Sequence, residues 1–342
     1  MLGKFYYISI FLIIMNISLL FSQNDTLEYK AKTIEVEAST LQRSNITNHL
    51  DIHCINISEI DKLNNSNIAE IIKYLPNTFI KDYGGVGGIK TISMRGAGSY
   101  QTAVLIDGMP ISSTQNSIVD FSLLPSAFFE NIDVITNCSS SLFGTNSIGG
   151  VIDLHSKIPK NKSFNISASI GSFGYSNLST SANSKLFKFP YFINFNYIKS
   201  NDNYPFDYND FGKSVSVKRQ NADISILSGN IGFEIPIKNC LFTNKLFTTN
   251  SERGVPGAVI TGKIENSLAR LAEFKLMNLS NLYLKIDSNI TNEIKLLISY
   301  SSSDYNDKEF LPNDNFVNSY FISHDVRITN DFSINYNKFF NL

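Results

Sequence analysis

Three segments decide the fold: ISMRGAGSY (92–100), TAVLIDGMP (102–110) and SLFGTNSIGGVIDL (141–154). Ala103–Ile106 is a short apolar run that predicts a strand, and the Asp107-Gly108 pair after it is typical of a hairpin turn with positive φ. Val151–Leu154 is a second apolar run that predicts a strand. It follows Gly144, Gly149 and Gly150, and glycines at such points indicate that another stretch of backbone approaches closely.

The composition of the whole chain excludes some partners and favours β-structure. The 342 residues carry 29 basic and 30 acidic side chains, so the net charge of −1 predicts no nucleic-acid partner. Phenylalanine and tyrosine are frequent, with 26 and 16 copies, and this bias favours β-strands and the aromatic girdles of membrane barrels. By composition alone, an ordinary soluble all-β protein is the alternative.

The first 22 residues predict a secretory signal peptide. Lys4 supplies the positive charge, Phe5–Phe21 is largely apolar, and Ser22 is a small residue before an expected cut at Gln23. A transmembrane anchor is the alternative, but the apolar run is short and no basic stop-transfer cluster follows it. We therefore expect export to the periplasm.

A short segment after the signal peptide alternates apolar and acidic residues. This period of two predicts an extended conformation. The segment consists of Thr33, Ile34, Glu35, Val36, Glu37 and Ala38.

Taken together, these segments resemble the plug of TonB-dependent outer-membrane receptors, nearest by eye to the vitamin B12 and siderophore receptor branch. In that family an arginine-glycine pair precedes a V-L-I-D-G strand and turn, and S-x-L-Y-G-x-x-A-I-G-G-V-I-N-I closes the domain. The resemblance covers about Thr33 to Lys157. The plug motif residues here are Arg95, Gly96, Asp107, Gly108, Glu130, Gly144, Gly149 and Gly150.

The resemblance implies roles for several of these residues. Arg95 is expected to be buried beneath a barrel wall and paired with carboxylates, among them Glu130. Asn137-Cys138-Ser139 stands where the family usually has arginine-glycine-proline, so one plug-to-barrel ion pair is not expected here. Thr33–Ala38 looks like the TonB box, which would add as an extended strand to a TonB-type energy-transducing protein of the inner membrane.

Within the plug, the sequence predicts a helix and two ligand-facing loops. Asn67 or Ser66 is the candidate N-cap, Pro76 a helix stop, and Asn77 a left-handed cap residue. The glycine-rich loop after residue 82 is not followed in P-loop order by lysine and Ser/Thr, so we interpret it as a plug apex. The expected ligand-binding residues of the two loops are Tyr83, Gly84, Gly85, Gly87, Gly88, Ser112, Ser113, Gln115 and Asn116.

From Ser163 onward, segments of alternating polarity predict transmembrane β-strands. The expected strands are Ser163–Ile170, Tyr175–Lys185, Tyr191–Lys199, Ala222–Ile235, Leu241–Thr249, Leu268–Leu284, Ile294–Tyr305 and Tyr320–Ile334. Short turns alternate with long loops, as periplasmic turns and extracellular loops do. A plug-filled barrel needs about 22 strands, so we expect only part of one here, from a truncated reading frame or a fragment.

The predicted fold class is therefore an α+β plug followed by antiparallel transmembrane β-barrel strands. The expected divisions are a signal peptide (1–22), a periplasmic linker with the TonB box (23–45), the plug (46–157) and the partial outer-membrane barrel (158–342).

Two features of the chain leave alternatives open. Asp202, Asp207 and Asp210 cluster in one long loop and are a candidate calcium site, with a merely solvated loop as the alternative. Cys54 and Cys138 both fall in the plug, where they would either pair in an oxidising compartment or remain free thiols.

The predicted function is active uptake of a metal complex, such as a siderophore or cobalamin, through the outer membrane of a Gram-negative bacterium. The implied partners are the energy-transducing protein, outer-membrane lipid and the ligand. No cofactor is expected. The sequence offers neither a nucleophile with a base nor paired carboxylates, so no enzyme is predicted. The alternative is a non-transporting fragment whose plug acts only as a periplasmic binding or interaction module.

Overall fold

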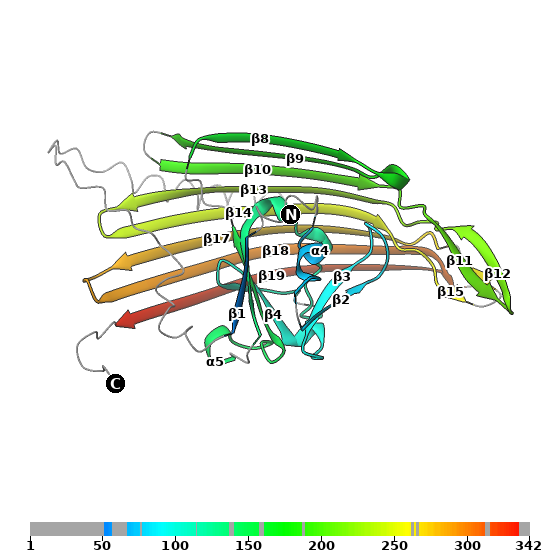
Figure 1. Ribbon diagram of the computed structural model, residues 1–342, viewed down its shortest axis with the longest axis horizontal. Helices are drawn as coiled ribbons and strands as arrows, with labels where there is room; N and C mark the ends of the chain where they lie inside the picture. Colours follow the sequence, from blue (N-terminus) through cyan, green and yellow to red (C-terminus); the bar gives the residue numbers. More distant parts are fainter. Residues whose placement is uncertain are drawn as a thin grey trace. The chain divides into compact units, whose positions relative to one another are not determined.

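The computed structural model describes residues 51–56, 67–75, 77–113, 115–136, 140–156, 161–186, 189–260, 263–264, 267–311 and 315–334 (Figure 1). All of these belong to one compact unit, His49–Leu342. The expected signal peptide, the TonB-box candidate Thr33–Ala38 and the Asn137–Ser139 segment lie outside the described residues.

The first part of the described chain, residues 51–156, folds around a five-stranded sheet and is called the plug below. Its strands are β1 (Ile52–Asn56), β4 (Thr102–Ile106), β5 (Met109–Ile111), β6 (Phe129–Ile135) and β7 (Gly150–Ser156). They lie in the order β1-β6-β7-β4-β5, and only the β4–β7 pair is parallel. The two apolar runs that the sequence analysis singled out therefore lie side by side, with Val104 opposite Ile152.

Short helices and a separate hairpin complete the plug. They are α4 (Ile68–Ile72), β2 (Thr78–Asp82), β3 (Lys90–Met94), η3 (Ser99–Gln101), η4 (Phe121–Leu123), η5 (Ser126–Phe128) and α5 (Ser140–Phe143). The side chain of Asn67 caps α4 by accepting from the N–H of Glu70 (3.1 Å), so the predicted N-cap is confirmed. Asn77 has the expected positive φ of 62°, but it does not cap the helix, which ends at Ile72 with Lys73 as its C-cap. Among the described residues, no helix is long and apolar enough to cross a membrane.

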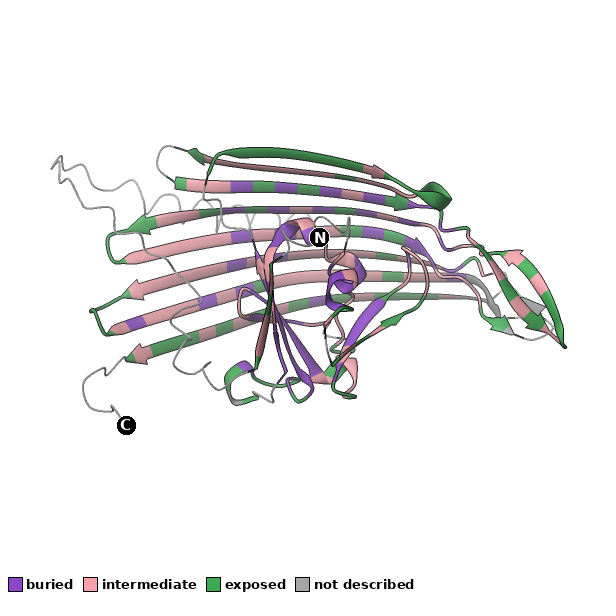
Figure 2. Ribbon diagram, viewed as in Figure 1, coloured by how far each residue is buried: buried purple, intermediate pink, exposed green. Residues whose placement is uncertain are grey.

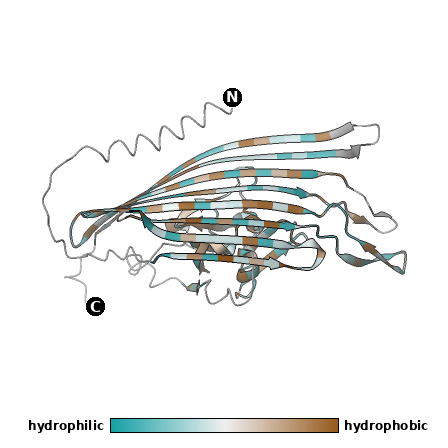
Figure 3. Ribbon diagram, turned by 90° about the horizontal axis from the view of Figure 1, so that it is seen from above, coloured by the Kyte–Doolittle hydropathy of each residue, from teal (hydrophilic) through white to brown (hydrophobic). Residues whose placement is uncertain are grey.

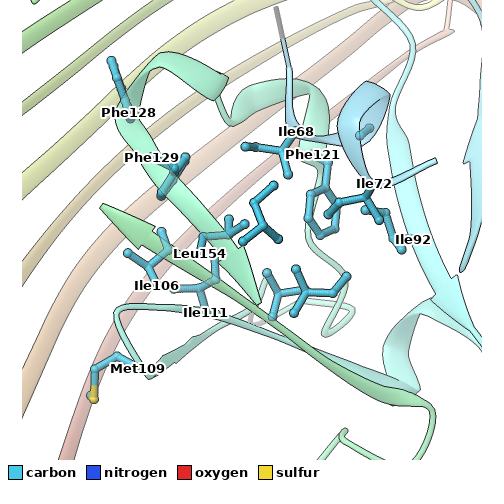
Figure 4. Close-up of a cluster of buried hydrophobic side chains, with 14 of the residues drawn as sticks. Ile68, Ile72, Ile92, Ile106, Met109, Ile111, Phe121, Phe128, Phe129 and Leu154 are labelled. Carbon is cyan, nitrogen blue, oxygen red and sulfur yellow. The ribbon is translucent and has the colours of Figure 1, made fainter. Parts of the chain in front are cut away.

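The core of the plug lies between one face of the five-stranded sheet and the short helices. Ile106 and Leu154 come from adjacent strands, and they gather with Ile72 of α4 and Phe121 of η4 (Figure 4). Full burial of such a side chain stabilises the fold by about 1.5–3 kcal/mol. The elements around this core are short, so each is held in the plug by the apolar side chains that it buries there.

The second part of the described chain is an eight-stranded antiparallel sheet, called the wall below. Its strands are β8 (Ser163–Ile170), β9 (Ser176–Leu186), β10 (Phe189–Ser200), β13 (Ile224–Ile237), β14 (Cys240–Gly254), β17 (Arg270–Lys285), β18 (Ile290–Leu311) and β19 (Asn315–Ile334). All eight predicted strands are confirmed. Four of them, β10, β14, β18 and β19, are longer than predicted, because hydrogen-bonded pairing continues past the point where alternating polarity stops.

The two faces of the wall differ in polarity. On β10 the apolar Ile193 and Phe195 are 44% and 38% exposed, whereas the alternate residues Asn194 and Asn196 are only 2% exposed. The same alternation of exposed and buried residues, and of apolar and polar ones, runs along the neighbouring strands (Figures 2 and 3). A sheet that is apolar outside and polar inside is what a barrel in a bilayer requires.

The connections of the wall alternate between its two ends. The long ones, β10 to β13 and β14 to β17, lie at one end, which we call the loop end. They carry two small hairpins that the sequence did not predict, β11–β12 (Pro205–Asp210 and Lys213–Lys218) and β15–β16 (Val259–Ile260 and Lys263–Ile264). The predicted alternation of short turns and long loops is confirmed only in part, because the short β8–β9 and β18–β19 connections lie at the loop end too.

Candidate functional site: the contacts between plug and wall

The β4–β5 hairpin of the plug turns at Asp107 and Gly108. Their φ angles are 51° and 80°, and a two-residue hairpin of the type I′ form needs positive φ at both positions. The positive φ predicted for Gly108 is therefore confirmed. The N–H of Asp107 donates to the carbonyl of Leu154 (3.0 Å), and that of Gly108 donates to the Asp153 carboxylate (2.9 Å), so β7 fixes the turn.

The Asp107 carboxylate binds partners in both the plug and the wall. It accepts from the Ser156 N–H (3.0 Å) and Oγ (2.7 Å), and it lies 3.0 Å from Lys245 Nζ on β14. Burial alone would raise the pKa of Asp107, but the Lys245 charge and the Ser156 hydrogen bonds outweigh it and lower the pKa. Asp107 is thus held as a carboxylate at the point where plug and wall meet.

Two further cations of the wall bind the backbone of the same hairpin. Lys295 Nζ on β18 donates to the Asp107 carbonyl (3.0 Å). Arg327 on β19 donates to the Pro110 carbonyl (2.9 Å) and to Ser112 Oγ (3.0 Å). We call Lys245, Lys295 and Arg327 the hairpin clamp.

Strand register explains how the clamp residues meet although they are far apart in the sequence. Lys245 is paired with Leu279, Leu279 with Leu297, and Leu297 with Arg327. These four residues form one row across four strands, so Lys245 and Arg327 lie at the same level of the wall. Lys295 lies two residues from Leu297 on the same strand and therefore points to the same face.

An apolar patch of the wall extends the core of the plug. Its members are Phe247, Met277, Leu279 and Leu297, which are buried in one cluster with the plug core. The ring of Phe247 stacks on that of Phe129 on β6, with centroids 6.5 Å apart. The plug is therefore seated on β14, β17 and β18 by both apolar packing and the clamp.

A second ionic anchor lies nearer the loop end. Arg253 on β14 binds Asp120 of the plug (2.7 Å) and Glu273 of β17 (2.5 Å), and it donates to the Gly87 carbonyl (3.2 Å). Asp120 in turn accepts from the N–H groups of Lys90 (3.0 Å) and Ser122. One guanidinium thus joins the wall, the body of the plug and the glycine-rich loop.

The glycine-rich loop, one of the two predicted ligand loops, packs closely against the wall. A Cβ on Gly85 would lie 1.6 Å from the Asp202 carboxylate, and one on Gly87 would lie 3.3 Å from the Cβ of Ile224. Gly85 also has a φ of 62°, and its carbonyl accepts from Lys90 Nζ (3.1 Å). Glycine is needed here because the wall approaches the loop backbone, and only part of the loop is left for a ligand.

The structure contradicts the candidate calcium site. Asp202 is buried beneath the glycine-rich loop, where Gly87 N–H lies 3.5 Å from its carboxylate, and burial raises the pKa of Asp202. Asp207 and Asp210 lie instead on strand β11. Among the described residues, no group of three or more His, Cys, Asp or Glu side chains is arranged to hold a metal ion.

Aromatic side chains gather beside the glycine-rich loop at the loop end. Phe173 lies edge-on to Tyr204 with ring centroids 6.3 Å apart, and Tyr204 lies 6.3 Å from Phe206. Arg219 lies over the Phe206 ring at 5.8 Å. Tyr83 in the loop is exposed and carries the Lys81 ammonium over its ring at 4.8 Å.

The expectation for Arg95 is wrong. Arg95 is exposed, and its Nη1 donates to the Thr136 carbonyl (2.8 Å) rather than to a carboxylate. Its φ of 54° places it in the turn after β3, from which its side chain crosses the end of β6. Arg95 forms no ion pair with Glu130, the expected partner, which lies in strand β6.

The motif glycines are required for two different structural reasons. Gly96 and Gly144 have φ angles of 77° and 79° with open space around them, so they serve turns. Gly149 would place a Cβ 2.8 Å from the Cβ of Ala97, and Gly150 has a φ of 146° beside Met94. The close backbone approach predicted before β7 is confirmed at these last two.

The second predicted ligand loop makes its wall contact elsewhere. Ser112 binds Arg327 of the clamp, whereas Gly87 binds Arg253, and these two arginines belong to different levels of the wall. Gln115 and Asn116 are exposed, and the N–H of Gln115 donates to Ser113 Oγ (3.2 Å). The two loops expected to bind one ligand are thus tied to separate anchors.

A histidine beside the clamp is strongly perturbed. His155 on β7 lies 2.9 Å from the Asp133 carboxylate. Burial would lower the pKa of His155, but the Asp133 hydrogen bond and the charges of Asp153 and Asp107 raise it to about 9. His155 is therefore an imidazolium at neutral pH and offsets part of the negative charge at this edge of the plug. Cys54 is a free thiol, and Cys138 lies outside the described residues.

Sequence reasoning missed the cations of the wall and their partners in the plug. Lys245, Lys295 and Arg327 occupy inward positions of strands, and period two could have identified them as charged residues facing the lumen. Asp120 had a local signal, because it precedes a short apolar turn and caps it. No local signal indicates which cation meets which carboxylate.

Comparisons with known proteins agree with this architecture. Residues 44–151 match the family model described as the TonB-dependent receptor plug domain. The vitamin B12 transporter BtuB of Vibrio vulnificus is 33% identical over 149 residues, which are 43% of this chain and 23% of that protein. BtuB of Vibrio cholerae is 28% identical over the same length, covering 24% of that protein. The matched stretch is thus about a quarter of these relatives' length.

Solved structures share the fold over most of the chain. The ferric citrate transporter FecA in its unliganded form has a TM-score of 0.64 at 14% identity, covering 83% of this chain and 44% of that one. The ferric enterobactin receptor PfeA from Pseudomonas aeruginosa has a TM-score of 0.62 at 14% identity, covering 83% and 46%. The chain therefore has the fold of a plug with part of its barrel, and spans less than half of these structures.

Proposed function

We propose that this chain, which belongs to the TonB-dependent receptors, takes part in the active uptake of a large, scarce ligand across the outer membrane. The ligand would be a metal complex such as a siderophore or a cobalamin. Residues 1–22 would direct export, 23–45 would hold the coupling segment, 46–157 would form the plug and 158–342 part of the barrel. The proposal rests on its relatives, which are named as a vitamin B12 transporter and siderophore receptors, and on one observation of this structure.

That observation is the way the plug is attached to the wall. The plug sits on the polar face of a sheet whose other face is apolar, so in a bilayer it would obstruct the lumen of the barrel. It is held there by separate contacts: the hairpin clamp, the apolar patch around Phe247, and Arg253. A plug attached in this way is an obstruction that can be moved, which import of a large ligand requires.

The uptake would proceed in three steps. The ligand docks at the loop end, where Tyr83 and the aromatic group around Tyr204 are accessible beside the glycine-rich loop. Docking shifts the plug toward a state in which the N-terminal segment is released into the periplasm. The energy-transducing partner then pulls on that segment, and the plug rearranges to open the lumen.

Thr33–Ala38 is the segment we assign to that partner, and it lies outside the described residues. An alternating segment of this kind binds by adding a strand to a sheet edge, so its affinity comes mainly from backbone hydrogen bonds. Proline removes one donor and fixes φ, whereas alanine leaves the backbone unchanged.

The experiment compares Val36→Pro with Val36→Ala at the chromosomal gene. Surface binding and accumulation are measured separately with labelled cyanocobalamin, ferric citrate and ferric enterobactin. We expect the proline variant to bind the transported probe normally but to accumulate less than a tenth of the wild-type amount, and the alanine variant to accumulate nearly normally. Undiminished accumulation in the proline variant would place the coupling segment elsewhere. Binding without accumulation by the wild type would favour the non-transporting alternative.

A further inference from the structure

One row of small polar side chains crosses all eight strands of the wall. Successive strand registers pair each member with the next. The members, in order from β8 to β19, are Ser167, Ser179, Asn196, Ser228, Thr249, Lys275, Ser301 and Ser323. We call them the polar row. It contains hydroxyls, one amide and one ammonium group, with no apolar or acidic side chain.

The polar row faces the plug side of the wall. Thr249 and Lys275 lie two residues from Phe247 and Met277, which are buried in the plug core. Side chains two residues apart on a strand point to the same face. The row therefore lines the lumen, between the level of the hairpin clamp and the level of Arg253.

The rows on either side lack this uniform character. The row nearer the loop end contains Ile198, Ile226 and Glu273, and its last member is Phe321. The row on the other side contains Phe247, Met277 and Asp325. Apolar groups interrupt both, so a continuous series of hydrogen-bonding side chains follows only one line across the eight strands.

Part of the polar row is buried without hydrogen-bond partners from the part of the protein that the structure describes. Asn196 Oδ1 and Ser228 Oγ are buried and have no hydrogen-bond partner among the described residues. Asn194 and Asn230 are paired in the neighbouring row. Among the described residues, neither the Oδ1 nor the Nδ2 atom of these two side chains has a hydrogen-bond partner. A buried polar group without a partner costs about 1–3 kcal/mol. On β10 and β13 the plug instead makes an apolar contact, in which Val86 and Leu123 pack against Ile198, Ile224 and Ile226.

The polar row is also inclined to the plane of the membrane. Strands lie ~4.8 Å apart and in a barrel they tilt by ~40° from its axis, so a line of paired residues is inclined to the membrane plane. Across the eight strands the polar row would advance roughly 20 Å along the barrel axis. That distance is close to the height of the apolar band of an outer-membrane barrel, about 25 Å.

We propose that the polar row is the track along which the imported ligand crosses the barrel once the plug has loosened. This inference rests on the proposed function. Hydroxyls and amides offer many weak, equivalent hydrogen bonds, which let a hydrophilic ligand move from one site to the next without being trapped.

Lys275 gives the track a preference for anionic ligands. It is the single charge of the row. Two carboxylates, Glu273 and Asp325, attract its ammonium, but they already bind Arg253 and Arg327, and Arg327 also repels it. Its ammonium is therefore left to attract an anionic chelate rather than to complete an ion pair of the wall.

The test places a bulky apolar ring on the track and, as a matched control, on the opposite face of the same strand. Ser301→Phe obstructs the row, whereas Ser302→Phe points to the lipid side. Both variants are made at the chromosomal gene, and their amounts in the outer membrane are compared. Surface binding and accumulation are measured with labelled cyanocobalamin, ferric citrate and ferric enterobactin.

We expect Ser301→Phe to bind the transported probe normally and to accumulate it at least tenfold more slowly, with Ser302→Phe unchanged. Normal accumulation in Ser301→Phe would overturn the track and leave the proposed function intact. A wild type that accumulates none of the probes would instead overturn the proposed function, and the track with it.

A second pair of variants keeps the test valid if Ser301→Phe does not assemble. Ser301→Cys and Ser302→Cys are treated on intact cells with a bulky thiol reagent, and the treated wild type controls for the native cysteines. Reagent-dependent loss of accumulation at position 301 alone supports the track, and equal accumulation before and after treatment refutes it. Lys275→Gln should slow ferric citrate more than cyanocobalamin; an equal effect on both would refute the anion preference.

Discussion

Replacing Lys245 with methionine should loosen the β4–β5 hairpin from the wall. Methionine keeps an unbranched chain but removes the ammonium 3.0 Å from the Asp107 carboxylate. Loss of one partner of a buried ion pair costs about 3–5 kcal/mol, because the other charge stays buried. Asp107 is 20% exposed and keeps its two Ser156 hydrogen bonds, so we expect the lower limit, about 3 kcal/mol.

Hydrogen exchange of the full chain in detergent, read by mass spectrometry, measures this opening locally. A loss of about 3 kcal/mol should speed exchange of the β4–β5 amides about 150-fold, with little change in the wall strands. Lys285→Met, the same change at an exposed lysine, is the control. Asp107→Asn with Lys245→Met should cost less than the sum of the single changes, because neither charge is then left alone. Exchange within threefold of wild type in Lys245→Met would refute the clamp.

Three further outcomes follow from the same structure. Gly85→Ala should displace the glycine-rich loop, because its Cβ would meet the Asp202 carboxylate; adding Asp202→Ala should restore part of the exchange protection and leave only the cost of the positive φ. His155 should titrate near pH 9 by NMR, and its pairing with Asp133 should stabilise the plug fully below pH 6.5 and be lost as the pH rises through 9; a midpoint near 6.5 would contradict this. Arg253→Lys should expose the Gly87 region to exchange, since one ammonium cannot hold the carbonyl and two carboxylates together; unchanged protection would show that the loop is held by packing alone.

The strands of the wall could be predicted because their signal is local. In Ile193-Asn-Phe-Asn196 each residue reports its own face by its polarity, and turn residues mark where the strand must end. The Asp107-Gly108 turn was predictable for the same reason, since few residue pairs accept two positive φ angles. The start of the plug helix was predictable from its N-cap residue, Asn67, whereas its end at Ile72 comes before the predicted stop at Pro76.

The anchors could not be predicted because they depend on how two distant parts of the chain, the plug and the wall, pack together. Lys245 and Asp107 are 138 residues apart, and nothing near either one identifies the other. Alternation places Lys245 on the inner face but does not give its level relative to the plug. Arg95 failed for a different reason: its role was carried over from the family, whereas the turn after β3 directs its side chain to the Thr136 carbonyl.

The strength of the two plug anchors decides which step of the proposed uptake needs outside energy. A ligand that docks at the loop end can act on Arg253 through the Gly87 carbonyl, and such coupling is typically worth 1–3 kcal/mol. The clamp and the apolar patch around Phe247 together hold the plug by something on the order of 10 kcal/mol. Ligand binding can therefore loosen the Arg253 anchor, but it cannot release the plug from the clamp and the apolar patch. Mechanical work by a partner must supply the difference.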